Sequence, residues 1–185
     1  MSIQFVKIYN RNDERLQSLI KLMWEEFEPH QLRPDKQLYE VIEKYDNHYF
    51  AAIEYEGQVV GVIVYWWLLN EFYYIEQFAI FKNSRGMKFG QKVLDKINNE
   101  IGGLWLLELD PIGDDIHNRL KKWYERNHFR VVEKVYDQPP YVPNEPTTPL
   151  WIMVNKDIEP EKLKKYLYTM KVDVYEIGYH ITRND

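Results

Sequence analysis

The chain has no cysteine among its 185 residues. This absence excludes structural disulfides, zinc or iron–sulfur sites with cysteine ligands, and acyl-enzyme mechanisms that use a cysteine nucleophile. Any group transfer must therefore be direct or must use another nucleophile. The sequence also lacks an HExxH motif and any facing pair of carboxylates at metal-ligand spacing. We therefore expect no bound metal.

Long apolar runs and a tail rich in Lys and Arg are also missing. The most apolar run covers residues 59–69, about half of the ~20 residues that a membrane-spanning helix needs. The first residues have neither the basic nor the apolar region of a signal peptide. Acidic residues outnumber Lys and Arg, and the formal charge is −5. We expect a cytoplasmic protein that binds neither membranes nor nucleic acid.

Strand and helix patterns alternate along most of the chain. Apolar and β-branched stretches predict strands over residues 3–9, 48–56, 58–69, 72–81, 104–109, 130–136 and 150–155. Helical spacing of apolar side chains predicts helices that begin near residues 13, 34, 86 and 114. Because hairpins and crossovers both occur, the expected fold is mixed α/β: an open sheet of six to seven strands flanked by about four helices.

We expect one domain over residues 1–156 and a short C-terminal extension of unknown role over residues 157–185. Within this extension only residues 163–167 have a clear helical pattern, and the VDVYEI stretch after them is ambiguous. The sequence leaves a homodimer open.

A basic strand–loop–helix segment follows the fourth predicted strand. Residues 77–94 contain no acid but four basic residues, Lys82, Arg85, Lys88 and Lys92. Glycines in the loop permit close approach of a ligand, and the first N–H groups of a helix attract anions. The segment therefore favours a pyrophosphate ligand over the alternative of a solvated basic helix start. The P-loop and GxGxxG motifs are both absent.

This loop resembles motif A of the GNAT superfamily of N-acetyltransferases, through the sequence Arg85-Gly86-Met87-Lys88-Phe89-Gly90 after Phe78-Ala79-Ile80. In that family the loop binds the pyrophosphate of acetyl-CoA, and the strand pairs with its pantetheine. Lys88 stands where the family usually has a glycine. The resemblance implies acetyl-CoA as co-substrate, contacted by Phe78, Ala79, Ile80, Arg85, Gly86, Met87, Lys88, Phe89, Gly90, Gln91 and Asn118.

Residues 123–129 resemble a second motif of the family, aromatic-Tyr-Glu-x-x-Gly-Phe, near the end of the fourth helix. His128 replaces the usual glycine, so we expect Asn127 to supply the left-handed cap. The resemblance implies a bacterial-type N-acetyltransferase that moves acetyl directly from CoA to a primary amine of a small acceptor, with Tyr124 as the acid. The alternatives are a catalytically silent acyl-CoA-binding regulator and a protein-interaction domain of the same fold.

Two carboxylates interrupt apolar strands and are candidates for the general base, Glu76 and Glu108. An unpaired buried carboxylate costs several kcal/mol, so each must lie at the rim of the sheet or be paired. We favour Glu76 slightly. The alternative for both is a solvated or ion-paired strand residue without a catalytic role.

Aromatic residues are candidates for acceptor recognition. Trp24 and Phe27 lie among Glu25, Glu26 and Glu28, a combination that suits a cationic amine, although such a run is also typical of a solvated helix face. Tyr136 and Tyr141 belong to a second candidate region, around the proline-rich connection. They either line the acceptor pocket or brace the hairpin.

Overall fold

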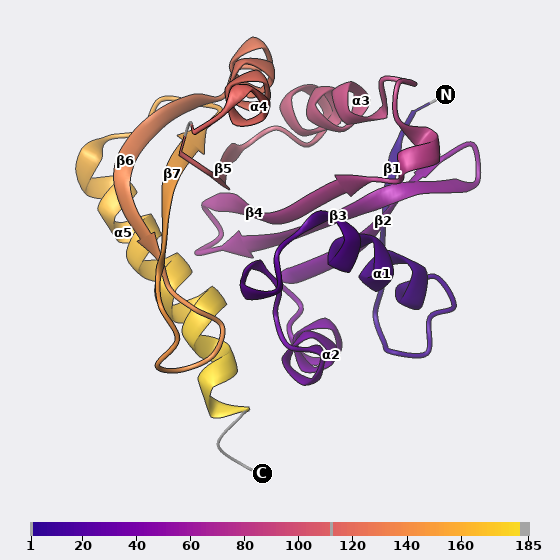
Figure 1. Cartoon of the computed structure of the whole chain (residues 1–185), viewed down its shortest axis with the longest axis horizontal. Helices are drawn as coiled ribbons and strands as arrows, with labels where there is room; N and C mark the ends of the chain where they lie inside the picture. Colours follow the sequence, from indigo (N-terminus) through magenta and orange to yellow (C-terminus); the bar gives the residue numbers. More distant parts are fainter. Residues whose placement is uncertain (1, 112, 182–185) are drawn as a thin grey trace. The chain divides into compact units, whose positions relative to one another are not determined.

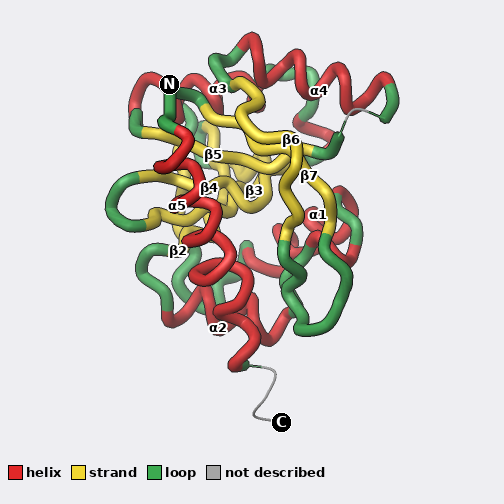
Figure 2. The backbone as a smooth tube through the Cα atoms, turned by 90° about the vertical axis from the view of Figure 1, so that its left-hand side faces the viewer, coloured by secondary structure: helices red, strands yellow, loops and turns green. Residues whose placement is uncertain are grey.

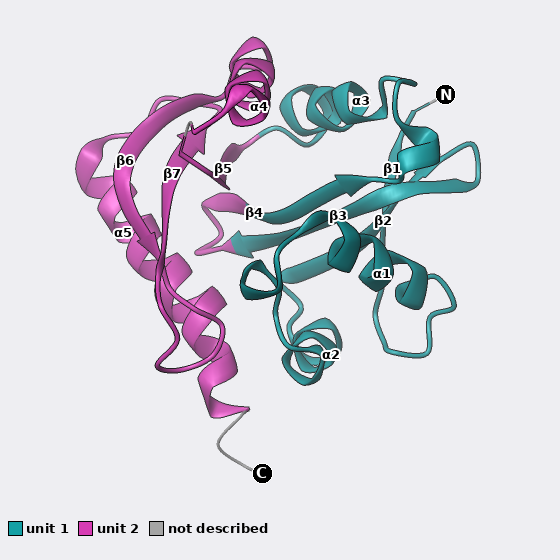
Figure 3. Ribbon diagram, in the orientation of Figure 1, with its two compact units in different colours: residues 1–67, 75–102 teal, residues 68–74, 103–185 magenta. Residues whose placement is uncertain are grey.

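The computed structural model describes residues 2–111 and 113–181 (Figure 1). The chain divides into two compact units, residues 1–67 with 75–102 and residues 68–74 with 103–185 (Figure 3). Seven strands and five α-helices occur in the described residues. The predicted mixed α/β class is therefore confirmed. No described helix is long and apolar enough to cross a membrane.

The first unit is built on an antiparallel sheet. Strand β1 (Gln4–Lys7) pairs with β2 (His48–Tyr55), which pairs with β3 (Gln58–Leu68). The β2–β3 hairpin closes at Glu56-Gly57, between the two predicted strands, where both residues have positive φ, 53° and 77°. Most of β4 (Phe72–Ile80) also belongs to this unit.

Helices α1 (Leu16–Glu26) and α2 (Asp35–Lys44) supply the core of the first unit. The apolar side chains of α1 recur at the spacing that the sequence predicts, so one face of the helix is buried. These side chains pack against apolar residues of β2 and β3 in one cluster that includes Leu16, Leu19, Ile20, Met23, Leu38, Ile42, Phe50, Ala52, Val62 and Val64.

Helix α3 (Phe89–Asp95) begins later than residue 86, where we predicted it. Gly86 and Lys88 have φ values of 82° and 61°, which are incompatible with a right-handed helix. After Asp95 the chain continues as a π-helical turn over Lys96–Ile101.

In the second unit, strand β7 (Thr148–Val154) lies between β5 (Leu104–Leu109) and β6 (Arg130–Gln138), antiparallel to both. Helix α4 (Asp115–Arg126) begins after Asp114, whose side chain accepts the backbone N–H of His117 at 2.8 Å. The helix therefore begins near residue 114, as the sequence predicts.

The end of α4 corrects one expectation. His128, and not Asn127, adopts the left-handed conformation, with φ values of 70° and −106° respectively. The Asn127 side chain is buried and donates to the carbonyl oxygen of Trp123 at 2.8 Å. Since Asn127 is held on the last helical turn, the following residue has to reverse the chain.

The C-terminal segment is more helical than the sequence indicates. Helix α5 covers Pro160–Met170 and continues through a π turn, Lys171–Tyr175, and a 3-10 turn, Glu176–His180 (Figure 2). The ambiguous VDVYEI stretch is therefore helical. Tyr166, Met170 and Val174 are fully buried at a spacing of four residues, and Tyr166 stacks on Phe72 of β4 with ring centroids 3.9 Å apart. Residues 182–185 of the predicted extension lie outside the described residues.

Candidate functional site

The predicted phosphate-binding loop connects β4 to α3 in the first unit. Phe81 donates its N–H to the carbonyl oxygen of Val60 at 3.0 Å, which fixes the end of β4 on β3. Arg85 Nε donates to the carbonyl oxygen of Ile80 at 3.1 Å, and Arg85 Nη2 lies 2.5 Å from Glu26 Oε2. The Arg85 guanidinium therefore ties the loop to the strand end and to α1.

Lys88 ends the loop in the left-handed conformation that a glycine adopts most easily. It is the N-cap of α3, yet its side chain makes no capping hydrogen bond. The helix start therefore presents N–H groups that have no intrahelical acceptor. Residues 85–88 are exposed and carry two positive charges. Backbone donors, the helix dipole and these charges together fit a phosphate group.

Replacing Lys88 with glycine is expected to raise the free energy of unfolding by about 1 kcal/mol, because a side chain in the left-handed region is strained. Gly86→Ala is the matched variant and should lower the free energy of unfolding, since Gly86 has a φ of 82° in the same loop. Urea denaturation of both variants measures the difference. A loss of stability in Lys88→Gly would contradict the strained conformation.

Glu76 lies in a buried ion pair of the first unit. Glu76 Oε1 is 3.1 Å from Arg33 Nη2, and both side chains are 2% exposed. Trp66 Nε1 donates to Glu76 Oε2 at 2.5 Å. This carboxylate is held by a guanidinium and an indole, as its place in an apolar strand requires.

His48 lies beside this ion pair and is fully buried. Its ring centroid is 4.7 Å from that of Trp66. Burial and, to a lesser extent, the charges of Arg33 and Lys7 hold the pKa of His48 well below its usual value. The imidazole is therefore neutral at pH 7, and neither ring nitrogen has a hydrogen-bond partner among the described residues.

Glu108 lies at the centre of a buried polar cluster in the second unit. Its Oε2 atom accepts hydrogen bonds from the Tyr74 hydroxyl at 2.8 Å, the Tyr175 hydroxyl at 2.7 Å and Gln138 Nε2 at 2.5 Å. Burial raises the pKa of Glu108, and hydrogen bonds from its neighbours, led by that of Tyr175, oppose the rise. Glu108 is a buried carboxyl held by neutral donors.

The predicted acceptor residues fall into two groups. Tyr136 and Tyr141 lie at the Glu108 cluster: burial and the charge of Glu108 raise the pKa of Tyr136, and the Tyr141 ring centroid is 5.1 Å from that of Tyr175. Trp24 and Phe27 belong to the first unit. Trp24 is 49% exposed on α1, whereas Phe27 packs against the core.

Tyr124, the predicted acid, is buried in α4. Its ring centroid lies 4.9 Å from that of Trp123 and 5.7 Å from that of Phe129. Burial raises the pKa of Tyr124, so the phenol keeps its proton at neutral pH. Asn118, a predicted CoA contact, is a half-buried residue of the same helix.

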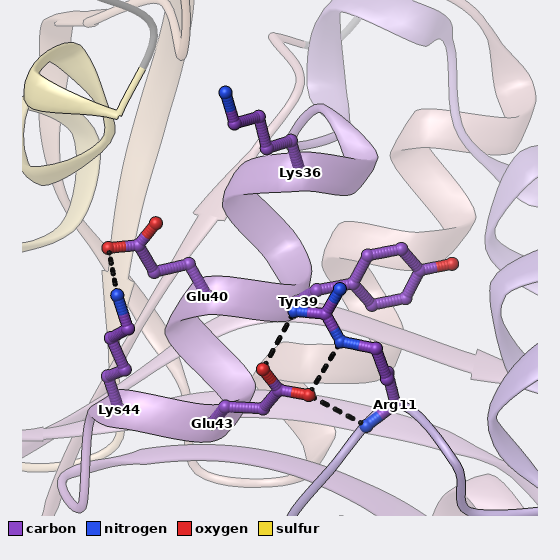
Figure 4. Close-up of a pocket in the computed structure, with 6 residues that line it drawn as sticks. All are labelled: Arg11, Lys36, Tyr39, Glu40, Glu43 and Lys44. Carbon is purple, nitrogen blue, oxygen red and sulfur yellow. Dashed lines mark hydrogen bonds and ion pairs between the residues drawn. The ribbon is translucent and has the colours of Figure 1, made fainter. Parts of the chain in front are cut away.

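A surface pocket of about 380 Å³ lies on α2 and is separate from the predicted site residues (Figure 4). Its charged side chains largely pair with one another: Arg11 Nη2 is 2.8 Å from Glu43 Oε2, and Lys44 Nζ is 3.0 Å from Glu40 Oε1. The hydrogen bond from Arg11 lowers the pKa of Glu43 to about 2, so Glu43 stays ionised. The pocket has the features of a solvated ion-pair network.

The partners of the two carboxylates are the residues that sequence reasoning missed. Arg33 and Trp66 hold Glu76, whereas Tyr74, Gln138 and Tyr175 hold Glu108. The one available signal was the interruption of an apolar strand by an acid. That signal indicates that a partner exists but does not identify it.

Comparisons with known proteins agree with this architecture. Residues 16–109 match the model of the acetyltransferase (GNAT) family. A structure from Bacteroides thetaiotaomicron, described as a GNAT-family acetyltransferase, superposes with a TM-score of 0.87 and 26% sequence identity. This match covers 95% of the present chain and 98% of the other. No curated protein matches the sequence.

Two more distant structures were solved with ligands. A Bacillus subtilis acetyltransferase in complex with CoA has a TM-score of 0.52 and 17% identity, over 85% of this chain and 99% of that one. Arabidopsis thaliana Naa50 in complex with the bisubstrate analogue CoA-Ac-MVNAL has a TM-score of 0.53 and 16% identity, over 85% and 100% of the two chains. At these identities the likeness concerns the fold.

Proposed function

Because the chain belongs to the acetyltransferase (GNAT) family, we propose that it transfers an acetyl group directly from acetyl-CoA to a primary amine. The family is one of acyltransferases with an acetyl-CoA-binding fold. The observation that carries the proposal is the loop before α3, where left-handed Lys88 leads into an uncapped helix start within a stretch free of acids.

The same loop supports acetyl-CoA as the co-substrate. Its pyrophosphate would bind the N–H groups at the start of α3, with Lys88 and Lys92 supplying positive charge. Arg85 is engaged with Glu26 and Ile80, so its contribution is to shape the loop. The remaining proposed contacts, in β4, α3 and α4, are Phe78, Ala79, Ile80, Gly86, Met87, Phe89, Gly90, Gln91 and Asn118.

Direct transfer requires a proton acceptor for the amine and a proton donor for the departing thiolate. The amine nitrogen forms a bond to the thioester carbon, the carbon–sulfur bond breaks, and the thiolate takes up a proton. We assign the acceptor role to Glu108, because its raised pKa brings it closer to neutral pH and no guanidinium holds it. Glu76, which the sequence slightly favours, is already paired with Arg33. We assign the donor role to Tyr124.

Replacing Tyr124 with phenylalanine is expected to lower kcat by about 10²-fold, the lower end of the usual range for general acids, because a thiolate is a good leaving group. The substitution removes one hydroxyl from a residue packed by its ring. Stability should therefore change little, and thiol release by the purified variant measures the effect. Unchanged kcat would mean that Tyr124 has only a packing role.

The function is tested by measuring thiol release from acetyl-CoA with a panel of polyamines, aminoglycosides, small primary amines and peptide N-termini. The panel includes peptides because Naa50 was solved with a peptide-containing analogue. At least one amine should become acetylated at the nitrogen. Binding of acetyl-CoA without turnover on any amine would instead favour the acyl-CoA-binding regulator. A cytoplasmic location, a bacterial origin and a homodimer stay predictions from the sequence.

Acceptor selection is the second part of the proposal. Tyr136 and Tyr141 at the Glu108 cluster are proposed to contact the acceptor, and the exposed indole of Trp24 offers an aromatic surface in the acidic stretch of α1. An aromatic face and nearby carboxylates favour a cationic amine. Phe27 packs against the core of the first unit, and we propose that it also contributes to acceptor binding.

A further inference from the structure

We propose that Tyr175, from the C-terminal segment, is a positioning residue for Glu108: its hydroxyl holds Oε2, so that Oε1 is the oxygen that accepts the proton of the amine. This inference rests on the proposed function, in which Glu108 is the proton acceptor. It also assigns a role to a segment that the sequence leaves without one.

Three donors contact the same oxygen of Glu108. The hydroxyls of Tyr74 and Tyr175 and the amide of Gln138 lie 2.8, 2.7 and 2.5 Å from Oε2. Tyr175 is central in this arrangement, since its hydroxyl is also 2.6 Å from the Tyr74 hydroxyl and 2.9 Å from Gln138 Nε2. Because the amide of Gln138 has two hydrogens, it can donate to Glu108 and to Tyr175 together.

The second oxygen of the carboxyl, Oε1, differs from Oε2 in its hydrogen bonding. Glu108 Oε1 is buried, and within the described chain no hydrogen bond of ordinary geometry reaches it. The hydroxyl of Tyr136 also faces this carboxyl, and burial and the charge of Glu108 raise its pKa. A carboxylate has about four lone-pair positions. With three donors on Oε2, the lone pairs that remain for a proton are those of Oε1.

Among the described residues, Glu108 is surrounded by hydrogen-bond donors and by no cation. The groups that face it are Tyr74 of β4, Tyr136 and Gln138 of β6, and Tyr175. Tyr141 packs behind Tyr175. Since no Lys, Arg or His among the described residues compensates the charge, hydrogen bonding is what stabilises the ionised carboxyl against the cost of burial. Each donor therefore has a direct influence on the proton affinity of Glu108.

The packing of the C-terminal segment fixes Tyr175 in place. Tyr175 and its neighbour Val174 are both fully buried, in the π turn that continues α5. The contact joins residues 67 positions apart in the sequence. A side chain held in this way loses little freedom on making its hydrogen bond, which is what a positioning role requires.

The test is the titration of the Glu108 carboxyl in the full-length protein, followed by ¹³C NMR after labelling of glutamate and assigned with Glu108→Gln. In Tyr175→Phe the pKa of Glu108 should rise by about 1–2 pH units, because a hydrogen bond to a charged group is lost. The acidic limb of the kcat/KM profile, measured with an amine that is acetylated, should move upward by the same amount.

Two further variants keep the test decisive. Tyr74→Phe removes a different donor from the same oxygen and should shift the titration in the same direction. Tyr179→Phe is the matched control, because its hydroxyl belongs to the same C-terminal segment but donates to the carbonyl oxygen of Pro140 at 2.8 Å. It should leave the titration unchanged. Urea denaturation of each variant confirms that it is folded under the conditions of the titration.

Equal titrations in Tyr175→Phe and Tyr179→Phe would overturn the proposal. So would a shifted titration with an unmoved acidic limb, because Tyr175 would then act on Glu108 without affecting the reaction. A wild-type protein that binds acetyl-CoA but acetylates no amine would refute the proposed function separately and with it the catalytic part of this inference, while the NMR titration would still decide whether Tyr175 controls Glu108.

Discussion

Replacing Glu108 with glutamine is expected to lower kcat for amine acetylation by about 10²–10⁴-fold, the usual contribution of general acid–base catalysis. Glutamine has the shape of the carboxyl but cannot take a proton from the attacking amine. Its carbonyl oxygen can accept the three hydrogen bonds that reach Oε2, and its NH₂ group can face the Tyr136 hydroxyl. Activity should therefore fall while the fold persists, as thiol release and urea denaturation of the same sample would record.

The stability of the Glu108→Gln variant provides an independent check with a defined sign. The unfolded chain releases the Glu108 proton near its ordinary pKa of 4.5, whereas the folded chain holds it to higher pH. Above pH 4.5 the folded state therefore binds more protons, and the free energy of unfolding falls as the pH rises through this window. Glutamine has no such proton, so the variant should gain stability relative to the wild type as the pH rises.

Glu76→Gln is the matched variant for activity. Because Glu76 is paired with Arg33, we expect a smaller loss of kcat from its replacement than from that of Glu108. Full activity in Glu108→Gln together with a large loss in Glu76→Gln would reverse the assignment of the proton acceptor. Both variants must be compared at temperatures where each is folded.

Replacing Arg33 with methionine is expected to lower the free energy of unfolding by about 3–5 kcal/mol, because it leaves the buried Glu76 charge without its ionic partner. The contact from Trp66 Nε1 at 2.5 Å is a neutral hydrogen bond. The indole of Trp66 lies in this cluster, so its fluorescence during urea denaturation reports the unfolding of the first unit.

The double variant Arg33→Met with Glu76→Gln distinguishes the contribution of the ion pair to stability from that of Arg33 packing. Because both charges are removed, the loss in the free energy of unfolding should be smaller than the sum of the losses in the two single variants. Such a difference is expected for a coupled pair. Additive costs would mean that Arg33 stabilises the fold through its hydrocarbon stem and not through Glu76.

Much of the fold could be predicted because its signals are local. The spacing of Leu16, Leu19, Ile20 and Met23 predicts α1, and Glu56-Gly57 predicts the hairpin between β2 and β3. The end of α4 is different. Asn127 and His128 are both polar, and the choice between them depends on a hydrogen bond from the Asn127 side chain that propensity alone does not reveal.

The C-terminal segment was underestimated because its apolar residues stand four apart among many charges. Tyr166, Met170 and Val174 form one buried line, but β-branched Val172 and Val174 favour a strand in a short window. Their burial in the second unit decides in favour of the helix, an effect of tertiary packing on local preference.

Within the candidate site, the loop before α3 could be predicted from the sequence, whereas the side chains that contact Glu76 and Glu108 could not. The acid-free stretch, the glycines and the helix start lie within a few residues of one another, so their combination is visible in the sequence. By contrast, Glu76 and Arg33 are 43 positions apart, and Glu108 and Tyr175 are 67 apart. A pattern with a period of two or of 3.6 residues carries no information on such contacts.

The central claim is that the loop before α3 binds the pyrophosphate of acetyl-CoA, and isothermal titration calorimetry with acetyl-CoA tests it most directly. The informative variant is Lys88→Glu, which keeps a side chain in the same left-handed position but reverses its charge; Lys164→Glu, at an exposed position of α5, is the control. We predict one binding site in the wild type, weakened at least about tenfold in Lys88→Glu and unchanged in the control. Absence of binding by the wild type, or equal affinity in Lys88→Glu, would contradict the claim.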